Sequence, residues 1–164
     1  MSFTITLASP EHMPQIWNIF HDVVKSGDTY VYPAETTESE FRALWCNPNT
    51  VTTYVALNDN QVVGTYILRP NFPGHGAHIA NCSYMVTAGA RSLGVGRKMA
   101  EHSIAQAQDA GYIGMQFNIV VSTNTKAVRL WQQLGFEVIG TTPKGFQHQT
   151  LGFVDTYIMY KTLV

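Results

Sequence analysis

The chain of 164 residues carries 10 basic and 11 acidic residues and two cysteines. A chain of this length buries about 70% of its unfolded surface around a single core, so we expect one domain over residues 1–164. The balanced charge, without a Lys/Arg stripe interleaved with aromatic residues, argues against a nucleic acid partner and favours a small substrate. Cys46 and Cys82 show neither disulfide-framework nor zinc-ligand spacing, which fits a reduced, cytoplasmic setting. A charged-then-apolar leader and a run of about 18 apolar residues are both missing from the sequence, so we expect neither export nor a membrane span.

The N-terminal segment predicts a short strand and an amphipathic helix. Residues 3–8 alternate in polarity like a strand, and Ser9-Pro10-Glu11 then supplies an N-cap, a first-turn proline and an acidic first turn. The helix that follows ends at Gly27. Its apolar residues recur at intervals of three and four, which predicts one buried stripe made of Met13, Ile16, Trp17, Phe20, Val23 and Val24.

From residue 28 onward the pattern predicts an aromatic loop and then strands and helices. The loop covers residues 28–34, which are too polar and too interrupted for a core strand. Two β-rich runs around the tight turn Asn58-Asp59-Asn60 predict a hairpin. The expected helices are residues 38–45, 95–110 and 124–134, and the further strands are residues 51–57, 62–68, 79–86, 115–121, 137–142 and 156–161. The resulting order is β-α-α-β-β-β-α-β-α-β-β.

The run Arg91-Ser92-Leu93-Gly94-Val95-Gly96, between an apolar strand and a helix, predicts a phosphate-binding turn. Its glycines let the backbone approach a ligand closely, and the helix that follows directs unpaired N–H groups and the positive end of its dipole at an anion. A Walker-type loop is excluded, because Gly94 is followed by Val95 and Gly96 rather than by Lys and then Ser or Thr. A dinucleotide fingerprint is disfavoured, because Met99 stands where a small residue packs helix on strand.

A second motif, Asn124-Thr-Lys-Ala127 followed by Trp131 and Gly135-Phe136, lies about 30 residues downstream, the spacing of one helix and one strand. The two segments together resemble the Gcn5-related N-acetyltransferase (GNAT) superfamily. Its first motif is Arg/Gln-x-x-Gly-x-Gly/Ala, and its second is Asn-x-x-Ala followed by an aromatic residue and Gly-Phe. The resemblance implies an α/β (α+β) fold with a single N-acetyltransferase domain. It predicts a mixed, twisted, mostly antiparallel sheet of about seven strands, with helices on both faces and splayed central strands.

The resemblance also implies acetyl-CoA as the acetyl-donor co-substrate, without a metal. Acetyl-CoA would enter between the splayed strands, its pantetheine arm pairing with the backbone of residues 85–87 like an added strand. Amides of the glycine turn would hold its pyrophosphate. The expected cofactor-binding residues are Met85, Val86, Thr87, Arg91, Ser92, Leu93, Gly94, Val95, Gly96, Arg97, Asn124, Ala127 and Trp131.

Two departures from the family leave the acid and the base open. Trp131 stands where most members place a proton-donating tyrosine, and an indole N–H is a very poor acid. The CoA thiolate would then take its proton from water or from another residue, such as Tyr84 or Tyr157. The strand before the glycine turn carries no carboxylate base, which favours a water relay with Asn118 or Asn81 as the catalytic residue. The structural alternative for Asn118 is an amide that satisfies a strand edge.

The function implied by the resemblance is direct transfer of an acetyl group to the amine of a small molecule or amino acid. Tyr30, Tyr32 and Asn118 are the expected substrate-binding residues, and the loops near residues 28–36 and 143–155 would build the acceptor pocket. A narrower resemblance points to the subgroup that acetylates proline analogues and small amino acids. The alternatives are a catalytically silent acetyl-CoA sensor and a protein N-terminal or lysine acetyltransferase.

Two further features concern assembly and metals. Apolar end strands make a homodimer possible. His75 and His78 lie in a Gly/Pro loop without a carboxylate or cysteine at ligand spacing, so we expect no metal site there.

Overall fold

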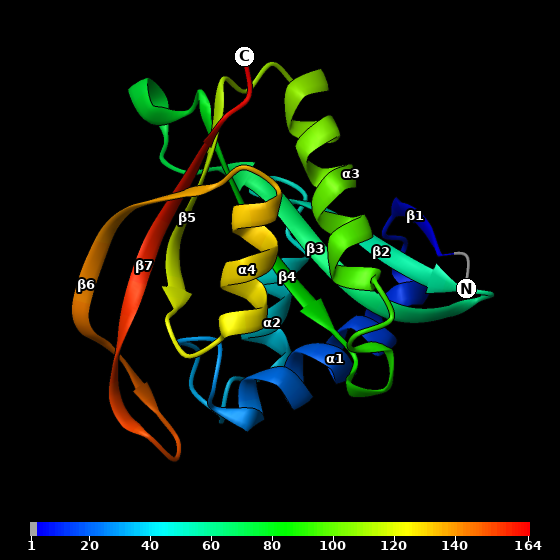
Figure 1. The fold of residues 1–164 in the computed structure, drawn as a ribbon. Coiled ribbons are helices and arrows are strands. Elements are labelled where there is room, and N and C mark those ends of the chain that lie inside the picture. Colours follow the sequence, from blue (N-terminus) through cyan, green and yellow to red (C-terminus); the bar gives the residue numbers. More distant parts are fainter. Residues whose placement is uncertain (1–2) are drawn as a thin grey trace.

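The computed structural model describes residues 3–164 and contains one seven-stranded sheet in the order β1-β2-β3-β4-β5-β7-β6 (Figure 1). β4 and β5 are parallel neighbours, and the other neighbouring pairs are antiparallel. The strands are β1 Thr4–Leu7, β2 Thr52–Asn58, β3 Gln61–Pro70, β4 Ile79–Val86, β5 Gly114–Val121, β6 Glu137–His148 and β7 Gly152–Thr162. This mixed, mostly antiparallel sheet confirms the predicted fold class.

The helices are α1 Met13–Ser26, α2 Glu38–Trp45, α3 Val95–Asp109 and α4 Thr125–Gln133. Together with the strands they follow the predicted element order. Gly27 ends α1 with a φ of 63°, a left-handed conformation that glycine adopts without steric cost. α2 begins with a capping box, in which Glu40 accepts from the Thr37 backbone N–H at 2.7 Å and Thr37 Oγ1 accepts from Glu40 N at 3.3 Å.

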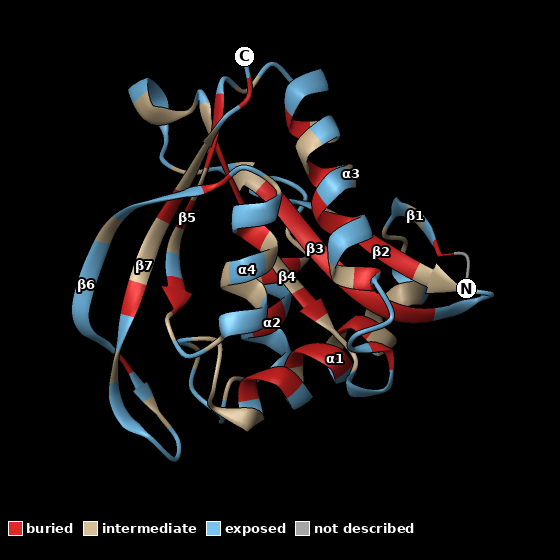
Figure 2. Cartoon of the chain, viewed as in Figure 1, coloured by how far each residue is buried: buried red, intermediate tan, exposed pale blue. Residues whose placement is uncertain are grey.

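The helices cover both faces of the sheet and create two cores (Figures 1 and 2). One core lies under α3 and α4 and includes Tyr66, Met99 and Met115. The other lies under α1 and α2 and includes Phe20 and Trp45. The apolar stripe predicted for α1 faces this second core, and it also contains the buried Ile19, which the prediction omitted.

The two central strands diverge soon after they meet. β4 pairs with β5 at Ile79 with Gly114 and at Ala80 with Met115. On its other edge β5 pairs with β7 from Gly114 to Val121, with a register irregularity between Phe117 and Val120. The predicted splaying is therefore present, and it separates the end of β4 from the middle of β5.

The C-terminal strands are much longer than predicted. The expected strands over 137–142 and 156–161 extend through most of residues 143–155, which were expected to form a loop. β6 and β7 instead form a long hairpin with an irregularity between Thr142 and Phe146. Apart from the buried Phe146, the outer part of β6 is exposed and mostly pale blue in Figure 2, so no alternation of buried and exposed residues marks it in the sequence.

Candidate active site

A cavity of about 550 Å³ lies where β4 and β5 diverge. Its wall combines residues of both strands with the glycine turn, α4 and the loop after α1. The predicted site residues in this wall are Tyr30, Tyr32, Asn81, Met85, Val86, Arg91, Ser92, Gly96, Asn118, Asn124, Ala127 and Trp131. The predicted residues outside it are Thr87, Leu93, Gly94, Val95 and Arg97. One cavity thus brings together residues as far apart in the sequence as Tyr30 and Trp131.

The glycine turn leads into α3 with backbone N–H groups available to a ligand. Gly94, the N-cap, has a φ of 86°, and the first backbone hydrogen bond runs from Lys98 N to Gly94 O at 3.1 Å. The N–H groups of residues 95–97 precede that bond and have no acceptor within the helix. Arg91 and Lys126 belong to the same cavity wall. This end of the cavity therefore suits an anion.

Several residues of the turn contribute through the backbone alone. Val95 is buried in the core, and the side chain of Leu93 is exposed. The guanidinium of Arg97 donates to Gln133 and pairs with Glu101 at 3.6 Å. Val95 and Arg97 are engaged elsewhere and Leu93 is apolar, so these residues can offer a phosphate their backbone amides.

α4 contributes a capped N-terminus and an aromatic wall. Asn124 Oδ1 accepts from Ala127 N at 3.4 Å and so caps the helix. Trp131 is buried, with ring centroids 4.9 Å from Tyr84 and 4.7 Å from Phe117. The indole closes one side of the cavity and packs as part of an aromatic cluster.

Among residues 84–87 at the end of β4, Val86 has its backbone groups free on the side of the split. Thr87 N donates to β3 at 3.0 Å, so Thr87 and Met85, two residues earlier, direct their backbone groups at β3. Val86 lies between them and directs its N–H and C=O at the split. The corresponding groups of Tyr84 are already bonded, because the Tyr30 hydroxyl donates to Tyr84 O at 2.7 Å and accepts from Tyr84 N at 2.8 Å. Of residues 85–87, which were expected to pair with the pantetheine arm, Val86 is the one whose backbone groups face the split.

Side-chain amides from both β4 and β5 line the split. Asn118 Nδ2 donates to Asn71 Oδ1 at 2.8 Å, and Asn118 Oδ1 accepts from Gln116 Nε2 at 3.0 Å. Asn81 is buried, and its Nδ2 donates to Gln116 O at 2.9 Å, which links β4 to β5. Asn118 has a fixed orientation with one N–H and one lone pair still unused. The nitrogen of Asn81 is engaged in the link between the strands.

The acidity of nearby groups is set by burial. Burial raises the pKa of the Tyr84 phenol well above its usual range, and its hydroxyl lies 2.7 Å from Ser103 Oγ under α3. Cys82 also lies in the cavity wall, and burial raises the pKa of its thiol to about 12. Tyr157 is half-buried on β7 and is not part of the wall. Both Tyr84 and Cys82 are therefore protonated at neutral pH.

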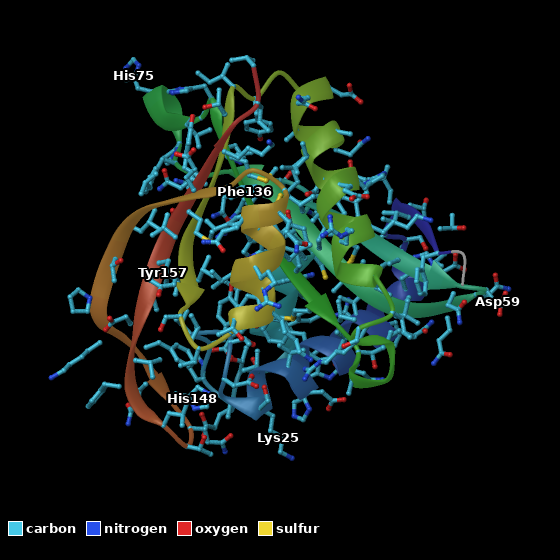
Figure 3. All side chains as sticks on the ribbon, in the orientation of Figure 1. Lys25, Asp59, His75, Phe136, His148 and Tyr157 are labelled. Carbon is cyan, nitrogen blue, oxygen red and sulfur yellow. The ribbon has the colours of Figure 1, made fainter. Side chains whose placement is uncertain are left out.

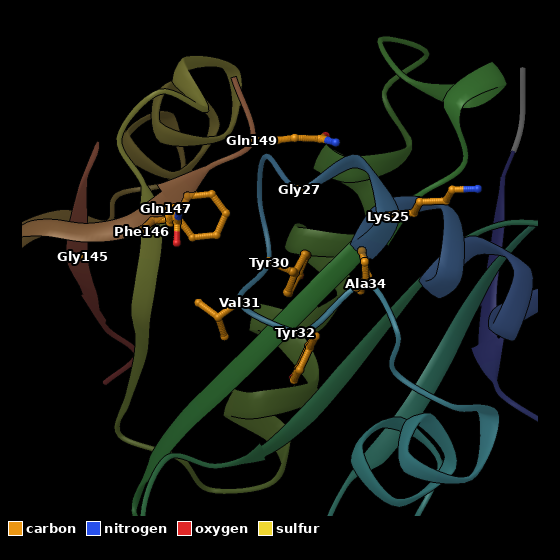
Figure 4. A pocket seen from close by; sticks show the side chains of 11 residues that line it. Lys25, Gly27, Tyr30, Val31, Tyr32, Ala34, Gly145, Phe146, Gln147 and Gln149 are labelled. Carbon is orange, nitrogen blue, oxygen red and sulfur yellow. The ribbon is translucent and has the colours of Figure 1, made fainter. Parts of the chain in front are cut away.

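The loop after α1 is held between the sheet and the hairpin. Besides the Tyr30 contact with β4, Gln149 N donates to Gly27 O at 3.0 Å. A second cavity of about 400 Å³ lies between this loop and the hairpin, with Phe146 and Val31 on its walls (Figure 4). The Tyr30 and Tyr32 rings stack with centroids 6.0 Å apart. Each of the two tyrosines lines both cavities.

Comparison with known proteins decides the family. Residues 16–136 match the model of the acetyltransferase (GNAT) family. The chain belongs to the GNAT acetyltransferase family. A GCN5-related N-acetyltransferase from Kribbella flavida is 42% identical, with a TM-score of 0.94 over 98% of this chain and 97% of that one.

Two other relatives extend the comparison. The N-acetyltransferase aca1 of Schizosaccharomyces pombe is 35% identical over 102 residues, which are 59% of this chain and 47% of aca1, so the match spans about half of that protein. A GNAT superfamily phosphinothricin acetyltransferase from Sinorhizobium meliloti, solved in complex with acetyl-CoA, is 19% identical with a TM-score of 0.87 over 99% of this chain and 89% of that one. The latter similarity concerns the fold.

Several features of this GNAT site were not predicted. The two bonds from Tyr30 to the β4 backbone, the contact of Asn71 with Asn118, and the presence of Arg69 in the cavity wall all depend on long-range packing. A partial signal for Arg69 exists, because it is a lone charge at the end of the apolar run of β3. No local sequence pattern marks the contact between Asn71 and Asn118 or the contact of Tyr30 with β4.

The described part of the chain, residues 3–164, contains no group of three or more His, Cys, Asp or Glu side chains able to hold a metal. His75 stands at the outer end of the β3–β4 connection, and His148 lies at the opposite end of the molecule (Figure 3). Within the same residues no helix is long and apolar enough to cross a membrane.

Proposed function

We propose that this protein transfers an acetyl group from acetyl-CoA directly to the amine of a small molecule or amino acid. The observation that carries the proposal is the cavity in the β4–β5 split. It joins the amide-rich start of α3 to a polar face with Asn118, and it is continuous with the loop that carries Tyr30 and Tyr32. A donor and an acceptor can therefore meet inside one space.

The residues present fit acetyl-CoA. The backbone N–H and C=O of Val86 face the split and can pair with the amide groups of the pantetheine arm. The N–H groups of residues 95–97 would hold the pyrophosphate, and Gly96 leaves space for its approach. The ring of Trp131 would pack beside the arm. When bound, acetyl-CoA supplies the activated thioester.

Direct transfer is favoured over an acetyl-enzyme pathway. The nucleophile that such a pathway would use is Cys82, and with a thiol pKa of about 12 its thiolate fraction at pH 7 is on the order of 10⁻⁵. In direct transfer the amine nitrogen forms the new C–N bond as the C–S bond breaks. The proton released by the nitrogen passes through water to the sulfur. Asn118 orients the amine or that water with its unused N–H and lone pair.

The experiment measures release of the CoA thiol from acetyl-CoA with a panel of small amines and amino acids. Thiol release that depends on the amine, with the acetylated amine as the second product, supports the proposal. Cys82→Ala should retain this activity. The sensor alternative predicts tight acetyl-CoA binding without thiol release. Trp131, at the position where most family members have a tyrosine, favours this alternative. Binding of acetyl-CoA without thiol release for any amine in the panel would establish it.

A further inference from the structure

Arg69 occupies the acceptor side of the cavity. It lies on β3 directly opposite Asn81 of β4, so both side chains emerge on the same face of the sheet. Asn118 of β5 belongs to the same cavity wall, and Arg69, half-buried, completes a polar row across the three strands. The opposite face of β4 carries Cys82 and Tyr84 in the core under α3 and α4.

The charge of Arg69 has no partner among the residues that the structure describes. Among residues 3–164 its guanidinium takes part in no ion pair and no side-chain hydrogen bond, whereas Arg42 pairs with Glu38 and Arg97 with Glu101. Keeping a half-buried guanidinium without an anion is unfavourable, because the group gives up part of its hydration without a compensating contact. A half-buried guanidinium without an internal partner is therefore suited to bind the anionic group of a ligand.

Its surroundings exclude an internal anion. The carboxyl in the cavity wall belongs to Asp28, which accepts from Ser26 Oγ at 2.6 Å. Burial raises the pKa of Tyr32 and the charge of Arg69 opposes that rise, so the phenol remains neutral and lies near the guanidinium. Neutral hydroxyl and amide groups around a single cation form a recognition site for a compact anion.

We propose that Arg69 binds the carboxylate of the acceptor, so that the acceptor is an amino acid whose carboxylate lies a few bonds from the reacting amine. This inference rests on the proposed acetyl transfer. A guanidinium matches a carboxylate in a bidentate geometry. Arg69 on β3 and Asn118 on β5 lie on either side of β4 in the wall of one cavity of about 550 Å³. A cation on this side of the cavity disfavours a polyamine as acceptor, because Arg69 repels its added positive charge.

The test compares small L-amino acids with their carboxamides as acceptors in the thiol-release assay. The wild type should prefer the acids by at least about tenfold in kcat/KM. Arg69→Gln should abolish this preference by raising KM for the acids, with the carboxamides unaffected, since hydrogen bonds to a charged group are worth about 10- to 100-fold. Arg69→Lys should retain an intermediate preference. Arg42→Gln, which removes an exposed arginine of α2, is the matched control and should change neither substrate series.

Two measurements keep the inference separate from the proposed function. Calorimetric affinity for acetyl-CoA should be equal in the wild type and Arg69→Gln, and thermal unfolding should show that the variant is folded. If no amine releases CoA, acetyl transfer is refuted, and binding of N-acetyl amino acids against N-acetyl amino acid amides then decides the role of Arg69. Selective loss of carboxylate binding in Arg69→Gln supports the inference. The inference is overturned if the wild type uses or binds acids and amides equally well. It is also overturned if Arg69→Gln weakens the use or binding of both by the same factor.

Discussion

Gly96 provides the sharpest test of where the phosphates of acetyl-CoA bind. It lies in the first turn of α3, in the cavity wall, and a Cβ added there meets only Leu130 Cδ2, at 3.9 Å. That is an ordinary van der Waals distance, and the residue does not adopt a positive φ. The protein itself therefore accommodates alanine, and because alanine favours a helix over glycine, Gly96→Ala should be neutral or more stable by up to about 1 kcal/mol.

Acetyl-CoA binding should respond in the opposite direction. The added carbon points into the space through which an anion approaches the N–H groups of residues 95–97, so the closest contacts with the phosphate are lost. We expect Gly96→Val to weaken the calorimetric Kd for acetyl-CoA by at least about tenfold, equivalent to about 1.4 kcal/mol, and Gly96→Ala to weaken it less. A loss of affinity in a protein whose thermal stability is preserved cannot arise from misfolding.

Gly89→Ala is the matched control. A Cβ at Gly89 meets nothing within 4 Å, and the residue lies outside the cavity wall, so the same chemical change should leave the affinity unaltered. A folded Gly96→Val variant with wild-type affinity for acetyl-CoA would refute the assignment of the phosphates to the start of α3.

Three other predictions concern the chemistry and the acceptor loop. Asn118→Ala should lose about 10²-fold in kcat/KM for the acceptor while keeping acetyl-CoA affinity, and steady-state rates within about threefold of wild type for both this variant and Asn118→Asp would contradict its role. Trp131→Phe should keep most of kcat and mainly weaken acetyl-CoA binding; a several-hundredfold drop in kcat at unchanged affinity would place the indole in the reaction. Tyr30→Phe removes both hydrogen bonds to the Tyr84 backbone, so the free energy of unfolding, measured by chemical denaturation, should fall by about 1–3 kcal/mol. The KM for the acceptor should rise as well. An unchanged free energy of unfolding would contradict the anchoring of the loop.

Local patterns were sufficient to predict the order of the elements. The apolar stripe of α1 and the glycine that follows it are both short-range signals, and both reappear in the structure. The glycine turn and the motif around Asn124 also lie where the sequence placed them, at the starts of α3 and α4. These features depend on residues within one or two turns of each other, which is why a single sequence reveals them.

The long hairpin was missed for a physical reason. Strand prediction relies on one buried and one exposed face, but residues 141–145 of β6 are exposed on both sides, and Phe146 is the one buried residue of the strand. Pro143 and Gly145 add composition typical of turns, and Lys144 adopts a positive φ of 54° at the irregularity. The pairing of Phe146 with Val154 continues the ladder nonetheless. Backbone hydrogen bonding across the hairpin, rather than burial, extends these strands.

The site was predicted as a set of segments but not as a network. The cavity unites most of the expected residues, yet their contacts are long-range: Tyr30 reaches Tyr84, and Asn118 reaches Asn71, across 54 and 47 positions of sequence. Arg69 was overlooked because a single arginine at a strand end is usually a solvated charge. Its significance depends on the missing partner, which only the packing of β3, β4 and the acceptor loop reveals. A homodimer stays a prediction.

The alternation of β4 gives its two faces different surroundings. Cys82 and Tyr84 face the apolar core under α3 and α4, whereas Asn81 and Ser83 face the side of the sheet that carries Arg69. We expect acetyl-CoA to bind along the split, at Val86 and the start of α3, and the acceptor to bind on the polar face. A substitution at Arg69 should therefore change the choice of acceptor without changing the affinity for acetyl-CoA.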